Sequence, residues 1–208
     1  MYSITQMFNY DAEVFVILYP FAAGGKFLQM IIQRDPGVCP VTNAPKPTDE
    51  QIKNYLQNNH NAHVVENEST PESIESMTAW PKYVFQFHQE IIEWENINSL
   101  MRRCSKLRPI FITCGREASR RLVNRRRLEK NDLQFVTPTE RAFNNFLPGF
   151  VNLWWNAPPA LTIEVDDFWN PDHAKSILND FFAKYKILTP GWEELYDAWH
   201  AKSIAPSL

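Results

Sequence analysis

Residues 14–27 read Val-Phe-Val-Ile-Leu-Tyr-Pro-Phe-Ala-Ala-Gly-Gly-Lys-Phe, and this stretch decides the fold. Its first five residues are β-branched, leucine or aromatic, and such a run predicts a buried strand over 14–18. Proline and glycine end the strand, and apolar residues at helical spacing predict a helix over 26–34. Backbone N–H groups converge where a glycine turn leads from a strand into a helix, so the stretch predicts an anion-binding corner.

Further strands and helices alternate along the rest of the chain. Strands are expected at 83–87, 109–113 and 161–165, and helices at 49–58, from 70, 91–107, 117–130, 139–147, 171–184 and 190–202. Such alternation predicts an α/β fold with a central parallel sheet and helices on both faces. Ligands bind at the carboxyl ends of the strands in these sheets, which is where loops 20–26, 88–90 and 114–120 are expected.

The length and composition indicate one globular domain. A chain of 208 residues is expected to form a single unit over 1–208, and the polar stretch at about 36–80 is expected to form a helical excursion from it. The net charge of −3 disfavours a general nucleic-acid binder. The early apolar run is too short to span a membrane, and Asp11 and Glu13 before it are unlike a signal peptide. The three cysteines match no zinc pattern and indicate reduced thiols in a cytoplasmic protein.

The lysine of the corner, Lys26, limits the kinds of ligand that the corner is expected to bind. Lys26 would add a full positive charge to the helix N-terminus, which favours a phosphate or sulfate group. Phe27 stands where a nucleoside-triphosphate loop needs Ser or Thr to hold magnesium, so a magnesium-dependent kinase is disfavoured. A tight structural turn with a solvated lysine is an equally good interpretation of this segment taken alone.

Two further segments place chemically useful residues after strands. Arg116 follows the strand at 109–113, and Arg120 and Asn124 follow at four-residue steps on one helix face, where they could hold a terminal phosphate. The neighbouring arginines from 121 to 127 are interpreted as a solvated face. His88 ends the strand at 83–87 and could accept a proton from a hydroxyl group, although a lone histidine is more often structural. The carboxylates at 164, 166 and 167 are interpreted as turn and helix-end residues.

Together these segments resemble the sulfotransferase family, in particular small bacterial and phage sulfotransferase-like proteins. The resemblance rests on the loop at 19–26, on the strand ending in His88, on the Arg116 and Asn124 pair, on residues 163–168 and on the closing helix at 192–199. It covers most of the chain in element order, and it implies a three-layer P-loop-like fold.

The resemblance also implies roles for particular residues. The donor would be 3′-phosphoadenosine 5′-phosphosulfate, with no metal, and the acceptor a small molecule or glycan carrying a hydroxyl or amine. Donor binding would fall to Arg116, to Asn124 and to five corner residues, namely Ala23, Gly24, Gly25, Lys26 and Phe27. Lys26 and His88 would be catalytic. A late Arg-Lys-Gly motif of the family is absent, which leaves a non-catalytic nucleotide-binding module as an alternative, and a small-molecule kinase as a third.

Overall fold

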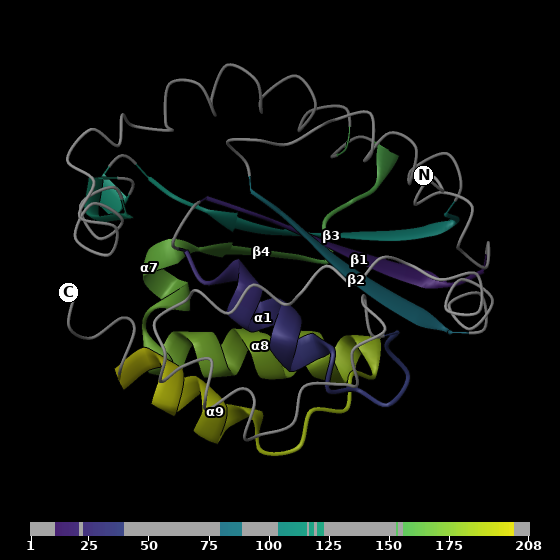
Figure 1. Cartoon of the computed structure of the whole chain (residues 1–208). Coiled ribbons are helices and arrows are strands. Elements are labelled where there is room, and N and C mark those ends of the chain that lie inside the picture. The colour runs from purple at the N-terminus through teal and green to yellow at the C-terminus, as the bar shows by residue number, and fades with distance from the viewer. Residues whose placement is uncertain are drawn as a thin grey trace, which may run out of the picture.

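The structure is a computed structural model, shown in Figure 1. It describes residues 11–20, 23–39, 80–88, 104–115, 117–118, 120–122, 153 and 156–201, without the side chains of residues 87 and 88. The helices predicted at 49–58, from 70 and at 139–147, and most of those at 91–107 and 117–130, lie outside the described residues. Most of the polar excursion at 36–80 lies outside them too.

A parallel sheet forms the centre of the described structure. Its strands are β1 (Glu13–Tyr19), β2 (Lys82–His88), β3 (Lys106–Thr113) and β4 (Leu161–Glu164). Every neighbouring pair is parallel, and the order across the sheet is β2-β1-β3-β4. The general α/β architecture predicted from the sequence is therefore confirmed.

The two faces of the sheet contribute to two separate apolar clusters. Alternate residues of β1 point to opposite faces, as the pleat requires, and its buried residues from Val14 to Tyr19 divide evenly between the clusters. One face packs against α1 (Gly25–Ile32), α8 (Pro171–Tyr185) and α9 (Trp192–Trp199), which lie together on one side of the sheet in Figure 1. Cys39, Cys104, Leu153 and Ala157 pack on the other face.

The strand boundaries differ from the predicted ones by one to three residues, and two of these differences follow from the packing of neighbouring elements. The sequence predicts a helix through residue 107, but β3 already begins at Lys106. That prediction is wrong at its end because Lys106 to Arg108 pair with β1 from Glu13 onward, and the intervening Leu107 is buried in the sheet. The strand predicted to end at Val165 ends one residue earlier, because Val165 begins α7 (Val165–Phe168).

Local capping signals account for the C-terminal helices. The Asn170 side chain accepts hydrogen bonds from the backbone N–H groups of Asp172 and His173, and Pro171 occupies the first turn, so α8 begins as predicted. Helix α9 starts at Trp192, two residues after the predicted start, because Gly191 caps it in the left-handed conformation at φ 68°. Within the described residues, no helix combines the length and apolar character that crossing a membrane requires.

A buried carboxylate joins three distant segments at the edge of the sheet where the strands begin. Asp35 follows α1 and is 3% exposed. It pairs with Lys82 at 3.0 Å and accepts hydrogen bonds from the backbone N–H groups of Gly37 and Leu188. The Lys82 ammonium also donates to the carbonyl of Lys186 at 2.6 Å. This cluster therefore ties α1, β2 and the end of α8 together.

We expect Asp35→Asn to lower the free energy of unfolding by about 1.5–3 kcal/mol, the usual contribution of a hydrogen bond to a charged group. The amide keeps the shape of the side chain but removes the charge that faces Lys82. Urea unfolding of both proteins would measure the loss. Asp172→Asn, at an exposed position in the first turn of α8, provides the control and should change stability far less. Equal stability of Asp35→Asn and the unmodified protein would contradict a stabilising role for the Asp35 charge.

Candidate functional site

The topology of the sheet marks one edge as the place for a ligand. β1 lies inside the sheet, with β2 on one side and β3 on the other, so the strand order reverses at β1. A crevice forms outside the carboxyl ends of parallel strands at such a reversal point. Tyr19 and His88 are register partners at the ends of β1 and β2, and Leu18 pairs with Phe111 near the end of β3. The loops after β1, β2 and β3 therefore start at the same edge.

The turn between β1 and α1 is tight. The N–H group of Ala23 donates to the carbonyl of Pro20 at 3.2 Å. Gly24 then takes the left-handed conformation with φ 95°, and its carbonyl accepts the first bond of α1 from Leu28 at 3.1 Å. The N–H groups of residues 25–27 precede that bond, so they have no acceptor within the helix. This is the strand, glycine turn and helix start that the sequence predicts for residues 19–27.

The N-terminus of α1 differs in charge from the other described helix starts. Acidic residues lie in the first turns of α7, α8 and α9, and Asn170 also caps α8. The first turn of α1 has no acidic residue, and its cap, Gly24, has no side chain to accept a hydrogen bond. The partial positive charge of this helix end is therefore not offset by a carboxylate of its own first turn.

Lys26 adds a full positive charge in the same turn. Its side chain is about half buried, and this burial lowers the pKa of Lys26 from its ordinary value of 10.5. A cation near a helix N-terminus is also disfavoured by the helix dipole. An anion bound at the corner would offset both effects. The corner thus combines converging N–H groups, a helix N-terminus and a partly desolvated ammonium group.

Aromatic rings pack against both glycines of the corner. A Cβ atom on Gly24 would lie 2.6 Å from Cζ2 of Trp199 and 2.9 Å from Cε1 of Phe168. A Cβ atom on Gly25 would lie 2.2 Å from the ring of Tyr19. These distances are far below van der Waals contact, so both positions require glycine for packing alone.

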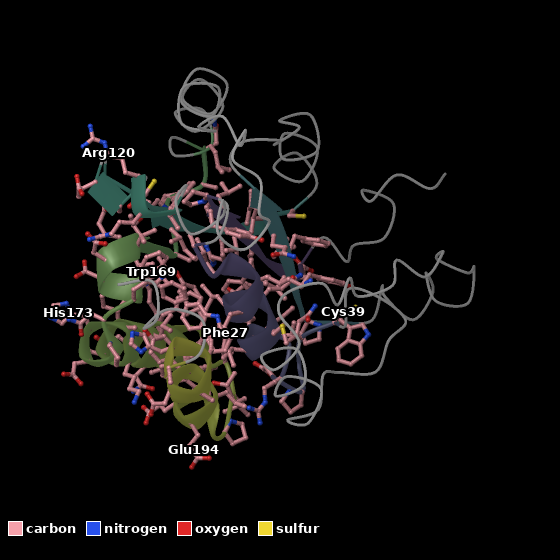
Figure 2. The ribbon with its side chains drawn as sticks, turned by 60° about the vertical axis from the view of Figure 1, so that its left-hand side comes forward. Phe27, Cys39, Arg120, Trp169, His173 and Glu194 are labelled. Carbon is pink, nitrogen blue, oxygen red and sulfur yellow. The ribbon has the colours of Figure 1, made fainter. Side chains whose placement is uncertain are left out.

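The other corner residues point into the core. The Phe27 ring stacks on Trp199, with 4.6 Å between centroids and 7° between planes. Figure 2 shows Phe27 inside the molecule, between α1 and α9. Ala23 is fully buried. A ligand at the corner would therefore meet the backbone of Ala23 and Phe27, and the side chain of Lys26.

The structure places His88 at the end of β2, level with Tyr19. The side chain of His88 lies outside what the structure describes. Two residues before it, Gln86 accepts a hydrogen bond from the Tyr19 hydroxyl at 2.5 Å. The strand end predicted to carry the histidine is thus adjacent to the strand that leads into the corner.

Arg116 and Asn124, the predicted partners of a terminal phosphate, lie outside the described residues. The described part of the helix between them buries Ala118 and Leu122 against the cluster that contains α1. Arg120 is exposed, lies 3.6 Å from Glu117, and extends into solvent in Figure 2.

The acidic residues after β4 have partners within the described structure. Asp166 pairs with Arg121, and Asp167 lies 3.0 Å from Nδ1 of His173. Both contacts connect surface residues of neighbouring elements, in keeping with turn and helix-end roles. Across the described residues, no group of three or more His, Cys, Asp and Glu side chains is arranged to hold a metal ion.

Sequence reasoning missed two residues that shape the corner, Phe168 and Trp199. They lie in α7 and α9, and Figure 1 shows α7 at the sheet edge where α1 begins. Both are apolar residues on short helices, a pattern that indicates core packing and gives no sign of the partner. No local signal in the sequence could have identified their contact with Gly24.

Comparison with known proteins adds no further assignment. No protein-family model matches the sequence, and no curated protein matches it. The described residues define an α/β protein with a parallel sheet and a glycine corner at the reversal point of its strand order. Its function has to be inferred from that corner.

Proposed function

We propose that the protein is a sulfotransferase with a P-loop-like fold, which moves a sulfuryl group from 3′-phosphoadenosine 5′-phosphosulfate to a hydroxyl or amine acceptor. The observation that carries the proposal is the N-terminus of α1. It has no acidic residue in its first turn, it contains the half-buried Lys26, and it follows the strand at which the sheet order reverses. An anionic donor suits this combination of charge and position.

In the proposed reaction, the acceptor oxygen or nitrogen attacks sulfur while the bond from sulfur to the donor phosphate breaks. Negative charge then grows on the departing phosphate. The N–H groups of residues 25–27 and the Lys26 ammonium would stabilise this charge at the corner. His88 lies at the end of the neighbouring strand β2, and it would accept the proton that the acceptor group loses. Arg116 and Asn124 would anchor the 3′-phosphate, so that most of the catalysis comes from positioning and charge stabilisation.

Calorimetry with 3′,5′-adenosine bisphosphate, the nucleotide product, tests the proposal directly. We expect saturable binding without added metal, followed by sulfuryl transfer to at least one member of a panel of hydroxyl and amine acceptors. Binding without transfer to any acceptor would favour the non-catalytic module. Absence of binding would contradict both.

The substitution Lys26→Met should weaken nucleotide binding without lowering the stability of the protein. We expect it to weaken the binding of 3′,5′-adenosine bisphosphate about tenfold, which corresponds to about 1.4 kcal/mol. Stability at pH 7 should stay equal or rise, because methionine removes a charge that burial disfavours.

The pH dependence of stability should distinguish the same two proteins. Because the pKa of Lys26 is lowered on folding, the unfolded chain holds more protons between the folded pKa and 10.5. The unmodified protein should therefore gain stability relative to Lys26→Met as the pH rises through this window. Urea midpoints at a series of alkaline pH values would measure the difference. A constant difference across the series would contradict the lowered pKa.

One observation favours the second candidate, a nucleotide-binding module without catalysis. The late Arg-Lys-Gly motif expected from the resemblance is missing, since Gly191 is the only glycine after residue 149 and no Arg-Lys pair precedes it. A magnesium-dependent kinase is less well supported. Phe27 occupies the position after Lys26, and its ring is stacked on Trp199 rather than offering a hydroxyl group.

A further inference from the structure

The side chain of Trp199, the last residue of α9, lies against Gly24 in the corner. Cζ2 and Cη2 of Trp199 would lie 2.6 and 2.8 Å from a Cβ atom placed on Gly24, while the same indole stacks on Phe27. Phe168 adds a second ring beside Gly24. Rings from α7 and α9 thus lie against Gly24, the residue that caps α1.

Several contacts fix α9 in this place. The Tyr196 hydroxyl donates to the carbonyl of Phe168 at 2.6 Å, and Nε2 of His200 lies 2.7 Å from the carbonyl of Trp169. Lys175 pairs with Asp197 at 2.6 Å. These bonds anchor α9 to α7 and α8, so the position of the Trp199 ring is set by the rest of the C-terminal region.

Glycine by itself does not determine the geometry of the corner. A glycine adopts positive and negative φ with similar ease, so Gly24 needs an external constraint to remain at φ 95°. Rings that occupy the space beside it limit the alternatives, because packed cores tolerate little change in volume. The constraint on the backbone of α1's first turn therefore comes from α7 and α9.

We propose that Trp199 is a positioning residue for the anion-binding corner. Its indole, held by α9, keeps Gly24 in the left-handed conformation and thereby keeps the N–H groups of residues 25–27 converged on one point. By thermodynamic linkage, an anion at the corner also stabilises the docked position of α9. This inference rests on the proposed function for its ligand, but the mechanical constraint on Gly24 can be tested without one.

The substitution Trp199→Phe tests the constraint, with Trp192→Phe as its matched control. Phenylalanine keeps an aromatic ring against Phe27 but lacks the outer indole atoms that contact Gly24. Trp192 lies on the same helix and packs against Phe182 with 5.2 Å between centroids. Trp192 is not among the nearest neighbours of Gly24, so the same substitution there removes a similar amount of aromatic surface from α9, together with the indole hydrogen bond to Asn179.

Hydrogen exchange of the Leu28 amide reports on the corner, because this N–H group donates to the carbonyl of Gly24. In the ligand-free protein, we expect Trp199→Phe to speed its exchange at least tenfold more than Trp192→Phe does. Equal exchange in the two variants would overturn the positioning role. Should Trp199→Phe fail to fold, Trp199→Tyr against Trp192→Tyr offers the same comparison with another ring.

Binding of 3′,5′-adenosine bisphosphate provides the second readout. Trp199→Phe should weaken it about tenfold, within the 5–150-fold range typical of coupled sites, while Trp192→Phe should bind like the unmodified protein. Equal weakening in both variants would show a general effect of destabilising α9 and would overturn the inference. If the unmodified protein does not bind the nucleotide, the proposed function fails, and the exchange of Leu28 still decides whether Trp199 holds the turn.

Discussion

A Gly24→Ala variant should lose about 2–5 kcal/mol of unfolding free energy, the largest stability effect we expect from one methyl group in this protein. Two costs combine. The left-handed conformation at φ 95° disfavours any L-residue with a Cβ atom by about 1–2 kcal/mol. The added atom would also lie 2.6 Å from Trp199, and such overpacking costs about 1–3 kcal/mol. Urea unfolding, with the slope checked for two-state behaviour, would measure the loss.

Three other glycines separate the two costs. Gly191 has a positive φ of 68° and nothing within 4 Å of an added Cβ, so Gly191→Ala should show only the conformational cost. Gly25 has no positive φ but would place its Cβ 2.2 Å from Tyr19, so Gly25→Ala should show only overpacking. Gly115 has neither feature, and Gly115→Ala should stay within about 0.5 kcal/mol. If Gly24→Ala cost no more than Gly191→Ala, the rings of Trp199 and Phe168 would not constrain the turn.

The second large effect concerns catalysis. Under the proposed function, His88→Ala should reduce turnover by about 10²–10⁴-fold, the usual contribution of a general base. Nucleotide affinity should change less than twofold, because the histidine acts on the acceptor and the donor is held by the corner. His88 ends β2, whereas the corner follows β1. The loss of turnover and the loss of nucleotide binding can therefore be tested as separate effects.

Turnover and nucleotide binding have to be measured on the same preparation of the His88→Ala variant. His173→Ala serves as the control, because His173 is exposed at the start of α8, beside Asp167, and Figure 2 shows it at the outer surface. That control should retain full turnover. Loss of nucleotide binding in His88→Ala, or unchanged turnover, would remove the histidine from its proposed role.

Much of the sheet could be predicted from local sequence. The uninterrupted apolar run of β1 predicts a strand buried on both faces, and every residue from Val14 to Tyr19 is indeed buried. The Asn170-Pro171 pair predicts the start of α8, because capping depends on neighbouring residues alone. The boundary between the helix predicted at 91–107 and β3 was predicted less accurately, because the local sequence there fits both a helix and a strand. Leu107 fits helical spacing with the residues before it, and only its pairing with β1 makes it part of a strand.

The candidate site also has features that local sequence predicts and features that depend on distant contacts. The glycine turn and Lys26 at the start of α1 could be predicted, since a strand, a turn and a helix start follow one another along the chain. The surroundings of the turn and of Lys26 could not be predicted. The alignment of the ends of β1 and β2 depends on a pairing between residues more than sixty positions apart, and the lowered pKa of Lys26 depends on its burial.

By itself, the sequence determined that this chain would form a parallel α/β sheet with a glycine corner after its first strand, because strand, turn and capping preferences are local. Only the tertiary structure determined which side chains pack against the two glycines and so exclude a Cβ atom there. Gly25 lies against Tyr19, six residues earlier, but Gly24 lies against Phe168 and Trp199, which are far away along the chain. A contact of that kind depends on how the C-terminal helices pack against α1, and packing between distant segments leaves no periodic pattern in the sequence.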